Sequence, residues 1–195
     1  MQLKDKMNEY AKENHVPVMK DGGVQLLIQS LIDNDCHSFL ELGTAIARTT
    51  ILVASLKEDM RVVTIERNPD MIAQAKQNIA ESGLQERIQL IEGDALEVEN
   101  PQGPFDCIFI DAAKAQYQRF FLKYSELLSP DGIIVSDNMN FHGLVQHPEL
   151  THNRNTKQLV RKIQKYHDFL SELQDYETEF YDLGDGVAIT RRKSR

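Results

Sequence analysis

The chain has 195 residues, which suits one domain with a full hydrophobic core, so we expect a single unit over residues 1–195. Hydrophobic residues make up 41% of it, and no apolar run approaches the roughly 18 residues that span a bilayer, which argues against a membrane protein. The formal net charge of −8 argues against a general nucleic-acid coat protein, since phosphate contacts need clustered Lys and Arg. The polar start, residues 1–15, lacks the apolar core of a secretory signal and predicts a cytoplasmic protein.

Runs rich in Val, Ile and Phe alternate along the chain with longer stretches of helical spacing. The segments up to Ile32 are predicted helices, so that 1–35 forms a helical cover and 36–195 the core. The expected strands and the expected helix starts then follow in order: strands at 37–43, 61–66, 88–93, 105–111 and 132–138, and helices beginning near Ala45, Pro69 and Ala115. This alternation is typical of a mostly parallel sheet with helices on both faces.

The last part of the chain predicts one more helix and a hairpin. Residues 155–173 have the spacing of an amphipathic helix with Leu159, Ile163, Tyr166 and Leu170 on one face. Two strand-like runs within 176–192 flank the turn sequence Gly-Asp-Gly at 184–186, which indicates an antiparallel hairpin. The fold class expected is therefore α/β, with a Rossmann-like seven-stranded, mostly parallel sheet and a C-terminal antiparallel hairpin.

Acidic residues fall where the predicted parallel strands end. In an open parallel sheet ligands bind beyond the carboxyl ends of the strands, so these positions form a candidate site: Glu41, Glu66, Asp94, Asp111 and Asp137. Taken singly, Glu41 and Asp94 are equally consistent with solvated acids at strand ends. The two cysteines, Cys36 and Cys107, lie far apart and indicate neither a disulfide nor a metal site.

The first loop of the predicted sheet indicates a nucleoside ligand. Gly43 allows close approach of the backbone, and Glu66 follows it at about the interval of 20 residues at which related folds place the acid that binds ribose hydroxyls. The loop lacks the Gly-x-Gly-x-x-Gly pattern that seats a diphosphate, which also argues against a dehydrogenase. S-adenosylmethionine fits this description, with Asp94 placed to receive the adenine amino group.

A second group of residues predicts a magnesium site. Asp111 and Asp137 end neighbouring strands, and with Asn138 they offer hard oxygen ligands suited to Mg²⁺. The competing interpretation is that Ser-Asp-Asn merely caps a turn. Lys114 follows Asp111 by three residues and would give up its proton readily beside a bound cation, which would make it a general base; a lone lysine would instead be a solvated surface charge.

Five segments together resemble the divalent-metal-dependent class I O-methyltransferases, the group of the catechol and caffeoyl-CoA enzymes: FLELGTAIARTTILVA, TIE, GDALE, FIDAAKAQY and VSDN. Four others look most like the bacterial tRNA 5-hydroxyuridine methyltransferases: HVPVM, DAAKAQYQRFF, DNMNFHGLV and RNTKQLVRKI. One departure is visible, because the loop of the group often reads Gly-Thr-x-x-Gly and this chain has Ala47 and Arg48 there.

The resemblance implies roles for individual residues. The metal, Mg²⁺ or Mn²⁺, would be held by Asp111, Asp137 and Asn138, with Lys114 as the base. The cofactor S-adenosylmethionine would be bound by Met19, Glu41, Gly43, Thr49, Glu66, Asp94, Ala95 and Asp111. Among these, Glu66 would take the ribose, Asp94 and Ala95 the adenine, and Met19 would close over the cofactor, although a core plug under a helix fits Met19 nearly as well.

The reaction implied is methylation of the 5-hydroxyl of 5-hydroxyuridine at the tRNA wobble position, giving 5-methoxyuridine. The alternative is O-methylation of a small catechol-like or caffeoyl-CoA-like molecule. A tRNA anticodon stem-loop would be bound by the basic residues Arg154, Lys157, Arg161 and Lys162, which on residue type alone would be a solvated helix face. A homodimer is also expected, and a mere nucleotide-binding module is disfavoured because it needs no base.

Overall fold

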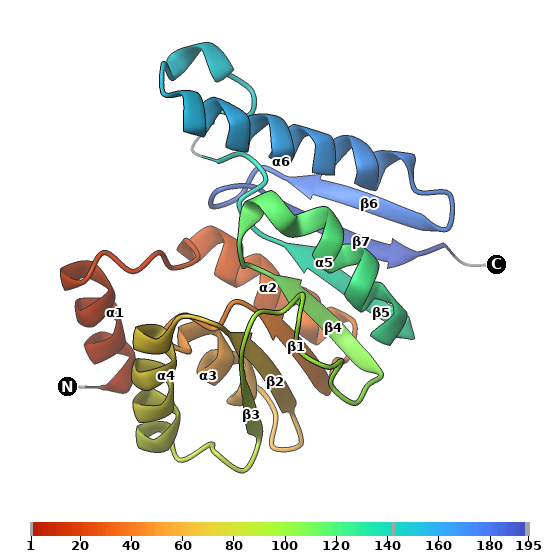
Figure 1. The fold of residues 1–195 in the computed structure, drawn as a ribbon. Helices are drawn as coiled ribbons and strands as arrows, with labels where there is room; N and C mark the ends of the chain where they lie inside the picture. Colours follow the sequence, from red (N-terminus) through yellow and green to blue (C-terminus); the bar gives the residue numbers. More distant parts are fainter. Residues whose placement is uncertain (1, 142, 194–195) are drawn as a thin grey trace.

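A single seven-stranded sheet forms the centre of the computed structural model, which describes residues 2–141 and 143–193 (Figure 1). The strand order is β3-β2-β1-β4-β5-β7-β6. The strands are β1 (Ser38–Leu42), β2 (Arg61–Glu66), β3 (Ile88–Glu92), β4 (Phe105–Ile110), β5 (Leu128–Ser136), β6 (Tyr176–Tyr181) and β7 (Val187–Arg192). β1 to β5 pair in parallel, whereas β7 runs antiparallel to both β5 and β6. The predicted fold class, including the terminal hairpin, is confirmed.

Helices cover both faces of the sheet, as the consecutive buried residues of β1, β4 and β5 require. The helices are α1 (Leu3–Glu13), α2 (Asp21–Asp33), α3 (Arg48–Ala54), α4 (Pro69–Ser82), α5 (Tyr117–Tyr124) and α6 (Arg154–Glu172), with short 3₁₀ turns η1 (Lys114–Gln116), η2 (Ser125–Leu127) and η3 (Pro148–Leu150). One core lies under α1 to α4 and includes Phe39 of β1; the other lies under α5 and α6 and includes Leu40. The two predicted leading helices are therefore present as α1 and α2.

Local signals explain where α4 begins and ends. The Asn68 side chain accepts hydrogen bonds from the backbone of Asp70 and Met71, and Pro69 occupies the first helical position. Gly83, with φ of 71°, ends the helix in the left-handed conformation. By contrast, the helix expected near Ala45 starts only at Arg48, because residues 43–47 form a loop in which Ala47 has φ of 65°.

α6 buries a slightly different stripe from the one predicted. Val160, Ile163, Tyr166 and Leu170 are buried, whereas Leu159 is only half-buried. None of the described helices has the length and hydropathy of a membrane span. Residue 142 of the 137–145 motif and residues 194–195 of the basic tail lie outside the described residues.

The C-terminal hairpin supports the loop that follows β5. The backbone N–H of Met139 donates to the Gly186 carbonyl at 2.9 Å, and that of Asn140 donates to the Asp185 carbonyl at 2.8 Å. Gly186 has φ of 82°, and a Cβ there would lie 2.5 Å from the Asn140 nitrogen, so only glycine fits. The turn between β6 and β7 therefore holds the loop that carries Asp137 and Asn138.

Candidate active site

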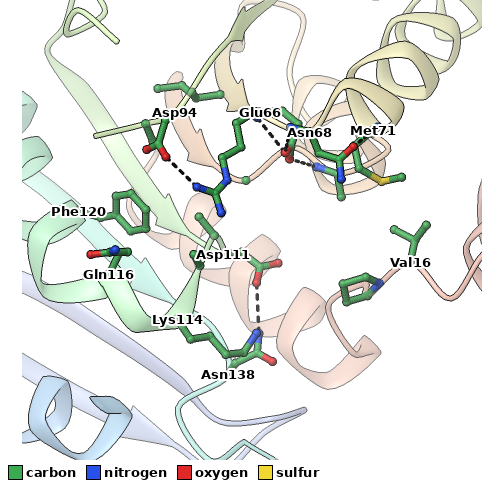
Figure 2. Close-up of a pocket in the computed structure, with 18 of the residues that line it drawn as sticks. Val16, Glu66, Asn68, Met71, Asp94, Asp111, Lys114, Gln116, Phe120 and Asn138 are labelled. Atoms are coloured by element: carbon green, nitrogen blue, oxygen red, sulfur yellow. Dashed lines mark hydrogen bonds and ion pairs between the residues drawn. The ribbon is translucent and has the colours of Figure 1, made fainter. Parts of the chain in front are cut away.

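A cavity of about 710 Å³ opens over the carboxyl ends of the parallel strands. Figure 2 shows Glu66 and Asp94 at one end of the pocket and Lys114 and Asn138 at the other, with Asp111 between them. A volume of this size lies within the range of pockets that bind small molecules and cofactors. The predicted convergence of residues at the strand ends is thus present in the structure.

The loop after β1 approaches the end of β4 without room for a side chain. Gly43 has φ of 100°, and a Cβ at this position would lie 2.5 Å from the carbonyl oxygen of Asp111. Ala45 and Ala47 also adopt positive φ values, 46° and 65°, which non-glycine residues rarely do. The backbone of this loop therefore forms one wall of the pocket, as predicted for Gly43.

Glu66 is held in place by backbone donors. Its Oε2 accepts from the N–H of Ala45 at 2.9 Å, and its Oε1 accepts from those of Arg67 and Asn68, both at 2.9 Å. A carboxylate has about four acceptor sites, so this side chain is oriented and still able to accept a hydrogen bond from a ligand hydroxyl. Such a fixed acid is what recognition of a ribose diol requires.

Asp94 faces the same end of the pocket from the loop after β3. Its Oδ1 accepts from the backbone N–H of Leu96 at 2.9 Å, and its Oδ2 pairs with the Arg67 guanidinium at 2.8 Å. The backbone hydrogen bond, followed by Arg67, lowers the pKa of Asp94. The carboxylate is therefore an ionised acceptor, and Arg67 would have to move before an adenine amino group could reach Oδ2.

Asp111, Asp137 and Asn138 meet at the ends of β4 and β5. Asn138 Nδ2 donates to Asp111 Oδ1 at 3.2 Å and to Asp137 Oδ2 at 2.9 Å. Asp137 Oδ1 is buried and has no hydrogen-bond partner among the described residues. A buried carboxylate oxygen without a donor suits a cation, and rotation of the Asn138 amide would turn a third oxygen toward it.

Ionisation of the two carboxyl groups of this cluster is unfavourable in the metal-free protein. Burial raises the pKa of Asp137 to about 6, opposed by the backbone of Asn138 and by Lys114. Burial and the neighbouring Asp137 charge raise the pKa of Asp111 well above its usual value, again opposed by Lys114. A divalent cation would remove this penalty, so the chemistry of the donor set fits Mg²⁺. The described residues contain no cluster of three His, Cys, Asp or Glu side chains; this set is two carboxylates and one amide.

Lys114 begins η1, directly after the loop that carries Asp111. Its side chain is half-buried and, in Figure 2, extends toward Asn138. It lowers the pKa of both Asp111 and Asp137, so its ammonium group lies within electrostatic reach of both carboxylates. The predicted grouping of one lysine with the three candidate metal ligands is therefore present.

Tyr117 contacts the backbone of this cluster from α5. Its hydroxyl is buried and donates to the Asp137 backbone carbonyl at 3.1 Å, and its ring packs edge-on against Tyr166 of α6. The Tyr166 hydroxyl lies 2.9 Å from the hydroxyl of Ser136. Tyr117 thus belongs to the core under α5 and α6, whereas Phe120 lines the pocket.

Two predicted cofactor-binding residues lie away from the pocket lining. Glu41 is 1% exposed and accepts hydrogen bonds from the hydroxyls of Thr50 and Thr64, the latter at 2.7 Å. Burial raises its pKa to about 7. Thr49 is half-buried in the second position of α3. The other predicted cofactor residues line the pocket: Met19, Gly43, Glu66, Asp94, Ala95 and Asp111.

Sequence reasoning did not assign several lining residues. The segment before α2 contributes Asn14, His15, Val16, Pro17 and Val18, and the start of α4 contributes its cap Asn68 and Met71. Within the Val-Pro-Val-Met segment, the sequence assigned a role in the site only to Met19; the proline and the polar residues before it indicate a non-helical segment that could cover a site. The basic residues Arg154, Lys157, Arg161 and Lys162 lie on α6, outside the pocket, although α6 packs against η1.

The chain matches the model of one protein family, described as O-methyltransferase, over residues 3–193. The chain belongs to the O-methyltransferase family. A crystal structure from Staphylococcus aureus of a candidate caffeoyl-CoA O-methyltransferase is 37% identical to this chain, with a TM-score of 0.92 and coverage of 99% of this chain and 93% of the other. The resemblance noted in the sequence is thereby confirmed at the level of the family.

Two curated relatives carry more specific names. The catechol O-methyltransferase of Niastella koreensis is 39% identical over 128 residues, which are 63% of this chain and 57% of that protein. A probable caffeoyl-CoA O-methyltransferase of Arabidopsis thaliana is 29% identical over 161 residues, 78% of this chain and 69% of the relative. The match therefore covers little more than half the length of the Niastella enzyme. An SAH-bound methyltransferase from Podospora anserina is 25% identical, with a TM-score of 0.86 and coverage of 100% and 89%.

Proposed function

We propose that the chain transfers a methyl group from S-adenosylmethionine to a hydroxyl group that has a second oxygen beside it, and that the acceptor is a small catechol-like molecule. The observation that carries this proposal is one pocket with two chemically distinct ends. Glu66 and Asp94 suit a nucleoside at one end, and Lys114 with the cluster of Asp111, Asp137 and Asn138 suits an acidic hydroxyl at the other.

The cofactor is supported by this chain's own residues and by a relative. The oriented Glu66 carboxylate fits a ribose diol, and the ionised Asp94 fits an amino group. The Podospora anserina methyltransferase was solved with SAH bound. S-adenosylmethionine would supply an electrophilic methyl group on its sulfonium.

A divalent cation fits the three oxygen ligands at the other end, because Asp137 Oδ1 is buried without a donor and both carboxyl pKa values are raised. When bound by Asp111, Asp137 and Asn138, Mg²⁺ would increase the acidity of the acceptor hydroxyl. Lys114, in its neutral form, would accept the hydroxyl proton at Nζ. The pocket walls would hold acceptor and donor in line and limit access of water.

The acceptor class follows from the relatives' names and from the chelating geometry. Two curated relatives are named for catechol and caffeoyl-CoA, whose reactive hydroxyl has an oxygen on the neighbouring carbon. These names favour the small-molecule alternative over the tRNA reading. Because this chain matches only part of the Niastella enzyme, the acceptor remains a proposal.

Methylation of 5-hydroxyuridine in tRNA is a second candidate, favoured by one observation. Arg154, Lys157 and Arg161 follow one another at helical spacing on α6, with Lys162 beside them, and α6 packs against the turn that carries Lys114. A stem-loop bound along this helix through its phosphates would bring a base toward the pocket. The hydroxyl and O4 of that base resemble the two oxygens of a catechol.

Purified protein with labelled S-adenosylmethionine and Mg²⁺ separates the two candidates. Transfer to catechol or caffeoyl-CoA but not to tRNA that contains 5-hydroxyuridine supports the small-molecule proposal, whereas the reverse result overturns it. Failure of the protein to bind S-adenosylmethionine would overturn both candidates. The oligomeric state measured in the same preparation tests the expected homodimer.

A matched variant sharpens the comparison. Replacing the four basic residues by glutamine, in Arg154→Gln, Lys157→Gln, Arg161→Gln and Lys162→Gln combined, should leave catechol methylation unchanged. If tRNA is the acceptor, the same variant should lose tRNA methylation and show a shallower dependence of tRNA affinity on salt, since fewer counterions are released.

A further inference from the structure

Arg48 is the first residue of α3 and directly follows the loop that forms one wall of the pocket. Its side chain is only 12% exposed. The Nε donates to Asn8 Oδ1 of α1 at 2.9 Å, and Nη1 donates to the backbone carbonyl of Met19 at 3.3 Å. The third nitrogen, Nη2, lies 3.5 Å from Asp21 Oδ1 at the start of α2. One guanidinium thus joins α1, Met19 and the start of α2 to the loop of residues 43–47.

The segment from His15 to Lys20, called the strap here, lies between two cavities. Val16, Val18 and Met19 line both the main pocket and an outer cavity of about 520 Å³ that Arg48 also lines. Val16 and Met19 are buried in the core under α1 to α4, whereas Val18 is 39% exposed. Apolar packing therefore holds two side chains of the strap, and polar contacts fix its backbone and its ends.

Polar contacts hold the strap near both ends and at the Met19 carbonyl. The N–H of Val16 donates to the Ala11 carbonyl at 2.9 Å, and Lys20 lies 3.4 Å from Asp185 in the C-terminal turn. Between these two points Arg48 reaches the carbonyl of Met19, whose side chain is 4% exposed and lies against Gly23. Arginine suits this position because its planar fork spreads its donors over three nitrogens that reach separate acceptors, whereas an ammonium group donates from a single nitrogen.

We propose that Arg48 is a positioning residue for the cofactor: it fastens the strap to the loop of residues 43–47, so that Val16 and Met19 close the pocket against the bound nucleoside. This inference rests on the proposed function for the identity of the ligand. Arg48 does not touch the reacting atoms. Its loss should therefore weaken cofactor binding while the methyl-transfer step at saturating cofactor is preserved.

The test compares the full-length wild type with Arg48→Met. SAH affinity measured by calorimetry should fall about tenfold, since a buried donor set is lost from the wall that contacts the ligand. The KM for S-adenosylmethionine should rise by a similar factor, with kcat within about twofold of wild type. Thermolysin, which cuts before apolar residues such as Val18 and Met19, should cleave the strap faster in the ligand-free variant.

Three further variants make the result interpretable. Lys12→Met removes an exposed cation that lines the same outer cavity and should leave SAH affinity and cleavage unchanged. Arg48→Lys should restore part of the affinity. If Arg48→Met does not fold, Asn8→Ala removes one acceptor from an exposed position of α1 and should move both readouts in the same direction by a smaller amount.

The outcomes separate this inference from the proposed function. A wild type that binds no SAH would overturn the proposed function. A wild type that binds SAH, with Arg48→Met equal to it in SAH affinity and in thermolysin cleavage, would overturn the role of Arg48 alone. A fall in kcat without a change in KM would also count against positioning and indicate general damage to the fold.

Discussion

Asn138 donates to Asp111 across 3.2 Å and so joins the ends of two neighbouring parallel strands. Its amide also donates to Asp137, and thereby offsets part of the repulsion between two buried carboxyl groups. An amide between two acids is a stable arrangement without metal and becomes a set of three oxygen ligands when the amide turns. Several consequences of this arrangement and of its neighbours can be measured.

Asp137→Asn should raise the melting temperature of the metal-free protein, because it removes a buried charge that raises the pKa of Asp111. The same change should abolish the stabilisation that Mg²⁺ gives the wild type, since one charged ligand is lost. Thermal unfolding with EDTA and with Mg²⁺ measures both effects. Asp131→Asn, an exposed acid of β5, serves as the control. An undiminished response of Asp137→Asn to Mg²⁺ would rule out the assigned ligand.

Lys114→Met should lower turnover by a factor of about 10² to 10⁴, the usual contribution of a general base, because no amine remains near the acceptor hydroxyl. SAH affinity should stay within a factor of about three, because Lys114 lies at the opposite end of the pocket from Glu66 and Asp94. Steady-state methyl transfer and calorimetry measure the two quantities. Lys76→Met, at an exposed ion pair with Glu92, controls for loss of a lysine. Near-normal turnover in Lys114→Met would remove its role as a base.

Glu41→Gln should flatten the dependence of stability on pH. The pKa of Glu41 rises from 4.5 to about 7 on folding, so its stabilising contribution is complete below pH 4.5 and is lost as the pH rises through 7. The loss is on the order of 3 kcal/mol. Glutamine has no such titration and can still accept from Thr50 and Thr64. Denaturant unfolding at pH 5 and pH 8 should therefore differ less in the variant, and an unchanged difference would show that Glu41 is ionised throughout.

Ala47→Gly should cost the protein about 1–2 kcal/mol less than Ala54→Gly. Both changes remove a buried methyl group, but Ala47 has φ of 65°, where an L-residue with a Cβ is strained by roughly 1–2 kcal/mol that glycine relieves. Ala54, at the end of α3, is helical, so glycine relieves no strain there. Urea unfolding of both variants measures the difference, and an equal loss of stability in the two would contradict the expected strain.

Parts of the fold follow from local sequence signals, and other parts depend on tertiary contacts. β2 lies at 61–66 as predicted, because a short apolar run bounded by polar residues leaves few other positions for the strand ends. Pro69 and the capping residue Asn68 likewise mark the start of α4. β5 begins at Leu128, before the apolar run that predicted it, since its early residues gain a partner only from pairing with β4. The pairing of β4 with β5 cannot be predicted from the local sequence of either strand.

The candidate site shows the same division. The grouping of Asp111, Asp137 and Asn138 was predictable because parallel strands end at one edge of the sheet. The buried position of Glu41 was not predictable, because an acid at a strand end can lie at the surface or in the interior. The hydroxyls of Thr50 and Thr64, which donate to Glu41, favour the interior position, and these contacts cannot be read from the sequence. The strap and the role of Arg48 were also missed, because their contacts join residues up to 165 positions apart.

β7 is the last strand in the chain, yet it lies inside the sheet between β5 and β6, and its turn supports the backbone of Met139 and Asn140. Truncation before β7 would therefore leave β5 without its antiparallel partner and the ligand loop without support. Such a variant should lose methyl transfer even though it keeps every proposed catalytic side chain.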